Sequence, residues 1–175
     1  MGDEVRGNRV FDTDLQAVCL MERIDDGAFS TGPELLPSHR AGKHLRHVLE
    51  FYECFLNGVE SGSVDYDARN HNEALEGNRL AACKKAAQII ERLQEISSLD
   101  DRRQLEVRME GDDIFLRSSI GHELQVLSSH TIHHFALISI ALRLHGIAVD
   151  AGFGMSPSTL RFQRVQSKWP AAEAR

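Results

Sequence analysis

Apolar residues recur at intervals of three and four positions in four stretches of the chain, which is the spacing of one face of an α-helix. We therefore expect helices over about Asp12–Asp25, His39–Val59, Glu73–Ile96 and Ser119–His145. The second stretch has a continuous apolar face, formed by Leu45, Val48, Leu49, Tyr52, Phe55 and Leu56. Four amphipathic helices indicate a helical bundle, because each apolar face needs a neighbour to cover it.

The last two of these helices have further expected features. In the third helix, the face expected to point inward is formed by Leu80, Cys83, Ala87, Ile90, Leu93 and Ile96. In the fourth helix, Ser118 or Ser119 can cap the first turn, and Gly146 should end the helix. At 1.5 Å per residue, this helix would be about 40 Å long.

The segments between the helices carry weaker patterns. Residues 104–109 and 114–117 flank a turn that contains Gly111, which predicts a short β-hairpin packed on the helices. Residues 63–72 have no sustained apolar period and are expected to form a loop. A Ser-Pro pair at the start of 156–162 predicts one short helical turn. The expected fold class is therefore all-α, a four-helix bundle with a small β-hairpin before the last long helix.

Length and composition fit one globular domain. The chain has 175 residues, of which 42% are hydrophobic and 26% are charged, and these values are typical of a folded domain. We expect a single domain over residues 1–175, with its core at about 12–162. The formal net charge of -6 argues against nonspecific nucleic-acid binding, which needs a basic surface.

The cysteines and the apolar runs bear on where the protein acts. Cys19, Cys54 and Cys83 make an odd count without a CxxC pair, which indicates free thiols in a reducing compartment. The first residues are polar and acidic, unlike a signal peptide. The longest strongly apolar run, 135–142, is too short to span a bilayer. We therefore expect a cytoplasmic protein with no membrane partner.

The candidate chemistry lies in the histidines, of which the chain has nine. His130 and His134 are four positions apart, so their rings project from one helix face and can bind one metal ion at about 2.0–2.1 Å. His47 in the second expected helix is the natural third ligand, and His44 is a weaker candidate. Three neutral imidazoles would leave open positions for water or substrate, which suits zinc, nickel or iron.

These residues and their neighbours also have ordinary structural explanations. Polar side chains or water can satisfy buried histidines in place of a metal ion. Glu123 is a candidate catalytic base or an orienting group for a ligand histidine, or it can simply interact with the helix dipole. Cys54 can face the same cavity or pack as a small hydrophobic residue. His133 is offset by about 100° from His134, which favours a packing role.

Two segments, GKHLRHVLEFYECFLNGVESGSVDYDAR and HELQVLSSHTIHHFALISIAL, resemble the DinB-like (DinB/YfiT) superfamily of metal-dependent enzymes. The resemblance extends over about residues 12–162. It implies a four-helix bundle in which one histidine of the second helix and an HxxxH pair of the last long helix bind a divalent metal ion. By position, His47 corresponds to the first of these ligands, and His130 and His134 correspond to the pair.

The resemblance also implies a range of functions. Characterised members include thiol-dependent transferases and isomerases that use bacillithiol or mycothiol, and the metal-binding domain of ergothioneine synthases. We therefore expect a metal-dependent hydrolase or thiol-dependent transferase with a Zn, Ni, Fe or Mn ion, acting on a small molecule or low-molecular-weight thiol. Many members are homodimers, so a homodimer is expected here. The alternatives are a non-catalytic metal-binding or stress-related homodimeric bundle, and a bundle without metal that works only through dimer contacts.

Overall fold

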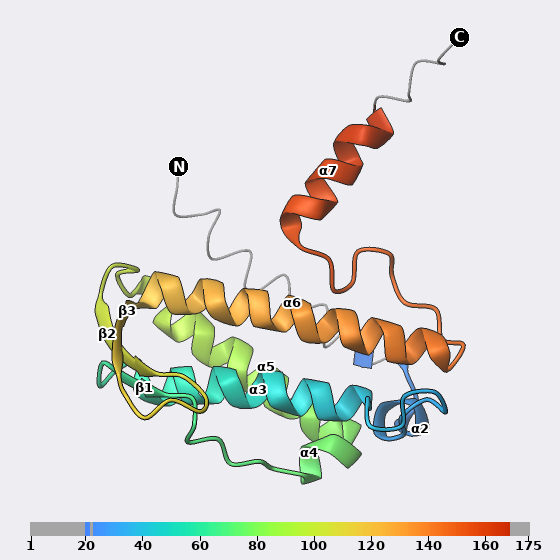
Figure 1. Ribbon diagram of the computed structural model, residues 1–175, viewed down its shortest axis with the longest axis horizontal. Helices are drawn as coiled ribbons and strands as arrows, with labels where there is room; N and C mark the ends of the chain where they lie inside the picture. Colours follow the sequence, from blue (N-terminus) through green and yellow to red (C-terminus); the bar gives the residue numbers. More distant parts are fainter. Residues whose placement is uncertain (1–19, 22, 169–175) are drawn as a thin grey trace.

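The computed structural model describes residues 20–21 and 23–168, which form mostly helices together with one small sheet (Figure 1). The α-helices that it describes are α2 (Asp26–Ser30), α3 (Ala41–Gly58), α4 (Ala74–Gly77), α5 (Arg79–Glu95), α6 (Ile120–Leu144) and α7 (Pro157–Lys168). The strands are β1 (Ser63–Asp65), β2 (Gln104–Arg108) and β3 (Leu116–Ser119), and a 3₁₀ helix, η1 (Ile96–Ser98), follows α5. The largely helical content agrees with the expected class.

Helix α3 is the centre of the described structure, because both α5 and α6 pack against it. The sheet lies where α3 ends and α6 begins, whereas α2 and α4 lie towards the other end of α3 (Figure 1). The expected first helix, Asp12–Asp25, lies mostly outside the described residues. Two of its described positions, Leu20 and Met21, are helical and buried.

The apolar face expected for α3 is confirmed. Its six members, Leu45, Val48, Leu49, Tyr52, Phe55 and Leu56, are all buried. The helix also buries charged residues such as Arg46 and Glu50, because α4, α5, α6 and β1 cover it from several sides. The buried side chains of α3 therefore contact neighbouring elements on several sides of the helix.

The third expected helix differs from the prediction in two ways. The helix is interrupted at Asn78, whose extended backbone (φ -120°, ψ 94°) separates α4 from α5. The Asn78 side chain accepts a hydrogen bond from the Ala81 backbone amide at 3.0 Å. Asparagine is a strong N-cap, so a new helix starts there. The expected inward face is correct only in part, because Leu93 is buried and Cys83 and Ile96 pack against the core. Leu80, in contrast, is 68% exposed, and Ala87 is exposed as well. The buried residues of α5 are Ala82, Ala86, Ile89 and Leu93.

Three strands form the sheet in the order β1-β2-β3. The antiparallel pairing of β2 with β3 confirms the expected hairpin, and its register places Gln104 opposite Ser119. The expectation of a loop over 63–72 is wrong at its start, because Val64 of β1 pairs in parallel with Val107 of β2. A strand of three residues is too short to show an alternating pattern in the sequence.

Helix α6 begins and ends close to the predicted residues. The Ser119 side chain accepts a hydrogen bond from the His122 amide at 3.3 Å, and Gly146 follows the helix with a positive φ of 76°, a conformation that favours glycine. Helix α7 continues to Lys168, beyond the expected turn at 156–162, and projects away from the other helices (Figure 1). None of the helices in the described ranges is long and apolar enough to cross a membrane.

Candidate metal centre

The structure brings the three histidines of the predicted ligand set together. His47 lies on α3, whereas His130 and His134 lie one turn apart on α6. One ring nitrogen from each residue belongs to a group whose atoms all lie within 4.8 Å of one another. The Nε2 atoms of His47 and His130 are 3.1 Å apart.

Packing between α3 and α6 accounts for this convergence. Thr131 and Phe135, each one position beyond a histidine of the pair, are buried in the core, so the histidine face of α6 borders the helix interface. Phe51 of α3 packs against a histidine from each helix. The centroid of its ring lies 4.9 Å from that of His47 and 4.3 Å from that of His130. The aromatic ring therefore supports two candidate ligands and limits how far they can turn.

The site keeps its imidazoles neutral. Burial and, to a smaller extent, the neighbouring histidines lower the pKa of His47 and His130 to about 4 and that of His134 to about 3. Neutral imidazole is the form that binds metal ions. Three neutral ring nitrogens within 4.8 Å of one another are a donor set that suits a divalent cation such as zinc. The Nδ1 atom of His130, which is not the ring nitrogen that faces His47, is buried without a hydrogen-bond partner among the described residues.

A second pair of histidines adjoins the group. The Nδ1 atom of His44 lies 3.0 Å from Nδ1 of His134, and Nε2 of His44 lies 3.2 Å from Nδ1 of His39. These contacts engage one ring nitrogen of His134 and leave Nε2 for a ligand. His44 is therefore placed to orient His134 by contacting the ring nitrogen of His134 that would not bind the metal, as partners of metal-bound histidines do.

Glu123 lies at the start of α6 and is buried, with 2% of its surface exposed. Its carboxylate accepts hydrogen bonds from the Tyr66 hydroxyl at 2.9 Å and from the Ser118 hydroxyl. Burial, and then the charge of Glu123, raise the pKa of Tyr66 and keep this phenol protonated. Glu123 is outside the group of three histidines within the described chain. Its catalytic role therefore stays a prediction, whereas its contacts join α6 to the segment after β1.

Cys54 and His133 lie near the site without joining the group. Burial raises the pKa of the Cys54 thiol to about 11, so the sulfur stays protonated at neutral pH, in keeping with a packing role. His133 is exposed, and its ring meets that of His134 edge-on, with centroids 5.1 Å apart.

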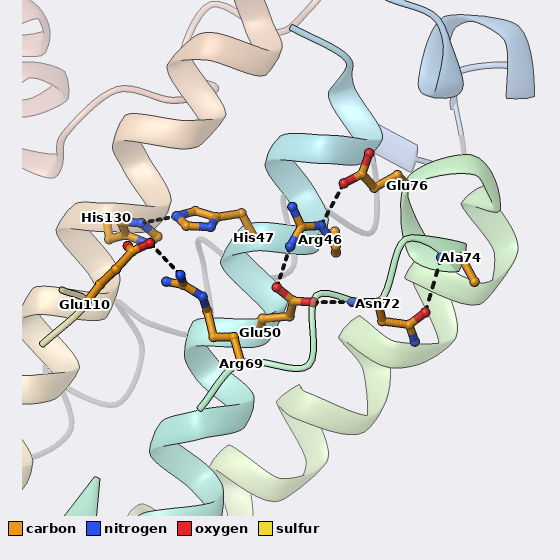
Figure 2. A network of polar contacts seen from close by, with 9 residues as sticks. All are labelled: Arg46, His47, Glu50, Arg69, Asn72, Ala74, Glu76, Glu110 and His130. Atoms are coloured by element: carbon orange, nitrogen blue, oxygen red, sulfur yellow. Dashed lines mark hydrogen bonds and ion pairs between the residues drawn. The ribbon is translucent and has the colours of Figure 1, made fainter. Parts of the chain in front are cut away.

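Sequence reasoning missed Arg69 and Glu110, which lie beside the histidines (Figure 2). Arg69 follows β1 and donates a hydrogen bond from Nη2 to Glu110 Oε1 at 2.5 Å, while its guanidinium carbon lies 4.8 Å from the Phe51 ring centroid. This bond lowers the pKa of Glu110 and raises that of Arg69. The two residues are 41 positions apart in segments without periodicity, so no spacing in the sequence indicated the pair.

Buried ion pairs lie on the side of His47 that faces away from His130 (Figure 2). Arg46 donates to Glu50 at 2.6 Å and to Glu76 of α4 at 2.9 Å. The other oxygen of Glu50 accepts from the Asn72 amide at 2.7 Å. This network attaches α4 and the segment that carries Arg69 to α3, which fixes them relative to His47.

A curated protein matches part of this chain. A curated protein of Rhizopus delemar described as FK506-binding protein 5 is 34% identical to this chain over 108 residues. The match covers 59% of this chain and 28% of the length of that protein, so most of the relative has no counterpart here. No protein-family model and no solved structure matches the chain.

Proposed function

We propose that this protein binds one divalent metal ion through His47, His130 and His134 and acts as a DinB-like metal-dependent hydrolase or thiol-dependent transferase. The observation that carries the proposal is the convergence of three neutral imidazoles, from two helices, within 4.8 Å. A set of three histidines suits Zn, Ni, Fe or Mn and leaves coordination positions open. An ion held there would supply an acidic water or thiol as nucleophile.

The residues around the group have definite parts in this proposal. His44 orients His134 through the contact between their Nδ1 atoms, and Phe51 restricts the rings of His47 and His130. Glu123, through its bonds to Tyr66 and Ser118, holds the start of α6 and is the candidate base. The proposed substrate is a small molecule or a low-molecular-weight thiol.

The bundle itself is also part of the proposal. Helices α3, α5 and α6 supply three members, and the segment that begins near Asp12 would supply the fourth. Its described residues Leu20 and Met21 are helical and buried, as a bundle helix requires. We further propose a homodimer, because α7 projects from the domain with Phe162 and Val165 each 62% exposed.

The deciding experiment is elemental analysis of the purified protein beside two single variants. We expect about one equivalent of metal in the wild type, as in other three-histidine sites, and a loss of nearly all of it in His130→Ala. His133→Ala is the matched control, because it removes an exposed histidine three positions along the same helix and should keep the metal.

Each result bears on the proposal. Equal metal content in all three proteins would place the ion elsewhere, and its absence from reconstituted wild type would leave a bundle whose histidines only pack. Metal that binds as expected, in a protein inactive towards thiol-transfer and hydrolase substrates, would favour the non-catalytic alternative.

A further inference from the structure

Arg69 has the least satisfied polar side chain near the candidate centre. Only 4% of the side chain is exposed, yet its Nε and Nη1 atoms have no hydrogen-bond partner among the described residues. A guanidinium stays charged at every relevant pH and carries five N–H groups in a rigid fork. Burying such donors unpaired is unfavourable, so their presence beside a candidate site indicates a ligand with oxygen acceptors.

The position of Arg69 directs these donors to the neighbourhood of the histidines. Phe51 provides one common surface, because its ring lies under the Arg69 guanidinium and packs against His47 and His130. Arg69 and Glu110 also lie beside the facing His47 and His130 rings (Figure 2). An anion bound to the fork would therefore lie next to the nitrogens that are candidates for metal binding.

Glu110 already places a carboxylate on the fork. Its oxygen accepts from Nη2 only, which leaves the other two nitrogens of Arg69, Nε and Nη1, without protein partners in the described chain. Glu110 follows Met109 on the turn between β2 and β3, its side chain is 51% exposed, and Gly111 after it has a positive φ of 80°. The contact is thus made from the solvent side, by a residue on a turn.

We propose that Arg69 binds the carboxylate group of the small-molecule substrate, and that Glu110 occupies this position when no substrate is bound. The inference rests on the proposed function, because it gives the substrate of the histidine centre a chemical class. Carboxylate is favoured over phosphate because the structure itself holds a carboxylate on the fork. A planar carboxylate can also accept two parallel N–H bonds from a guanidinium.

The test uses full-length, zinc-loaded protein and acetate as the probe. The titrations are followed in proton–nitrogen NMR spectra. The Arg69 Nε–H signal shows whether acetate binds at Arg69, and the backbone amide signals give its affinity. In Glu110→Gln, acetate should bind about tenfold more tightly than in the wild type, because a competing charge-assisted bond is removed. The double variant Glu110→Gln with Arg69→Lys should lose the gain, since lysine keeps the charge but lacks the fork.

A matched control comes from the pair of Arg108 and Asp65, which is joined by two hydrogen bonds of 2.9 and 2.6 Å. Within the described chain, Arg108 has no buried nitrogen without a partner. Asp65→Asn frees a guanidinium of the same charge on β2 and should not raise the affinity for acetate. Inorganic phosphate is titrated in parallel. Tighter binding of phosphate than of acetate to Glu110→Gln at the Arg69 signal would overturn the choice of carboxylate.

The outcomes separate this inference from the proposed function. Zinc retained at one equivalent, with an Arg69 signal that acetate does not move in folded Glu110→Gln, would overturn the inference alone. Failure of the wild type to take up zinc would overturn the proposed function and the inference with it. Thermal unfolding of each variant verifies the fold, and Arg69→Lys in the wild-type background provides a second variant if Glu110→Gln is unstable.

Discussion

At the scale of single residues, the centre consists of imidazoles that burial keeps uncharged. Free histidine takes up a proton near pH 6.5, whereas His47 and His130 do so only near 4 and His134 near 3. The folded protein therefore binds fewer protons than the unfolded chain between these values. Such a difference makes stability depend on pH.

The sign of this dependence gives a prediction. The unfolded chain gains protons as the pH falls below 6.5, so the free energy of unfolding of metal-free protein should fall as the pH is lowered towards 4. Urea unfolding in the presence of a chelator, at several pH values between 7 and 4, measures the slope. His134→Gln removes one of the groups and should flatten the curve. Identical slopes for His134→Gln and wild type would contradict the pKa assignment.

The histidine group could be foreseen from the sequence, but the ion pair of Arg69 and Glu110 beside it could not. A spacing of four places His130 and His134 on one helix face, and His47 follows from the apolar face of its own helix. Arg69 and Glu110 belong to a connection and a turn, where no period relates one residue to another. Only the parallel pairing of β1 with β2 brings these segments to the same side of the centre.

At the scale of elements, the buried face of a helix could be predicted correctly only where its apolar residues form a single stripe. In α3 the apolar residues form one stripe, and the expected core was correct. In α5 apolar residues occupy adjacent positions, such as Ala82 with Cys83 and Ile89 with Ile90, so two faces about 100° apart compete. The face with alanines faces inward, because small side chains allow close approach to α3.

Close approach also explains how α4 is held against α3. A Cβ atom built on Gly42 would lie 2.2 Å from the carbonyl oxygen of Glu76 and 2.7 Å from a ring carbon of Phe29. Gly42→Ala should therefore lower the free energy of unfolding by about 1–3 kcal/mol, as overpacking does. Gly77→Ala in α4 meets nothing within 4 Å and is the control, with an expected change within about 0.5 kcal/mol. Equal urea midpoints for the two variants would show that α3 and α4 can separate freely.

At the scale of the whole molecule, α7 is the feature that the domain alone does not explain. It projects from the other helices (Figure 1) and exposes Phe162 and Val165. Helix α6 adds Ile140 and Leu144, which are 50% and 44% exposed. Exposed apolar side chains on a projecting helix such as α7 are typical of surfaces that meet another protein, and a symmetric dimer would use the same surface twice.

This arrangement leads to a prediction about assembly. The wild type should sediment as a dimer, and the double variant Phe162→Glu with Val165→Glu should sediment as a monomer, because each change puts a charge into an apolar contact. Gln163→Glu adds a negative charge on the same exposed helix without removing apolar surface, and should remain dimeric. A wild type that is monomeric at high concentration would exclude the dimer.

The histidine group joins parts of the chain that are far apart along the sequence. His47 and His130 are separated by 83 positions, and the segment between them includes the whole sheet together with α4 and α5. An ion held by both helices, as we propose, would close a loop of that length and act as a cross-link. It would restrict the unfolded chain much as a disulfide bond does, but in a form that a chelator can reverse. Two fragments cut within that loop would then stay joined for as long as the ion remained bound.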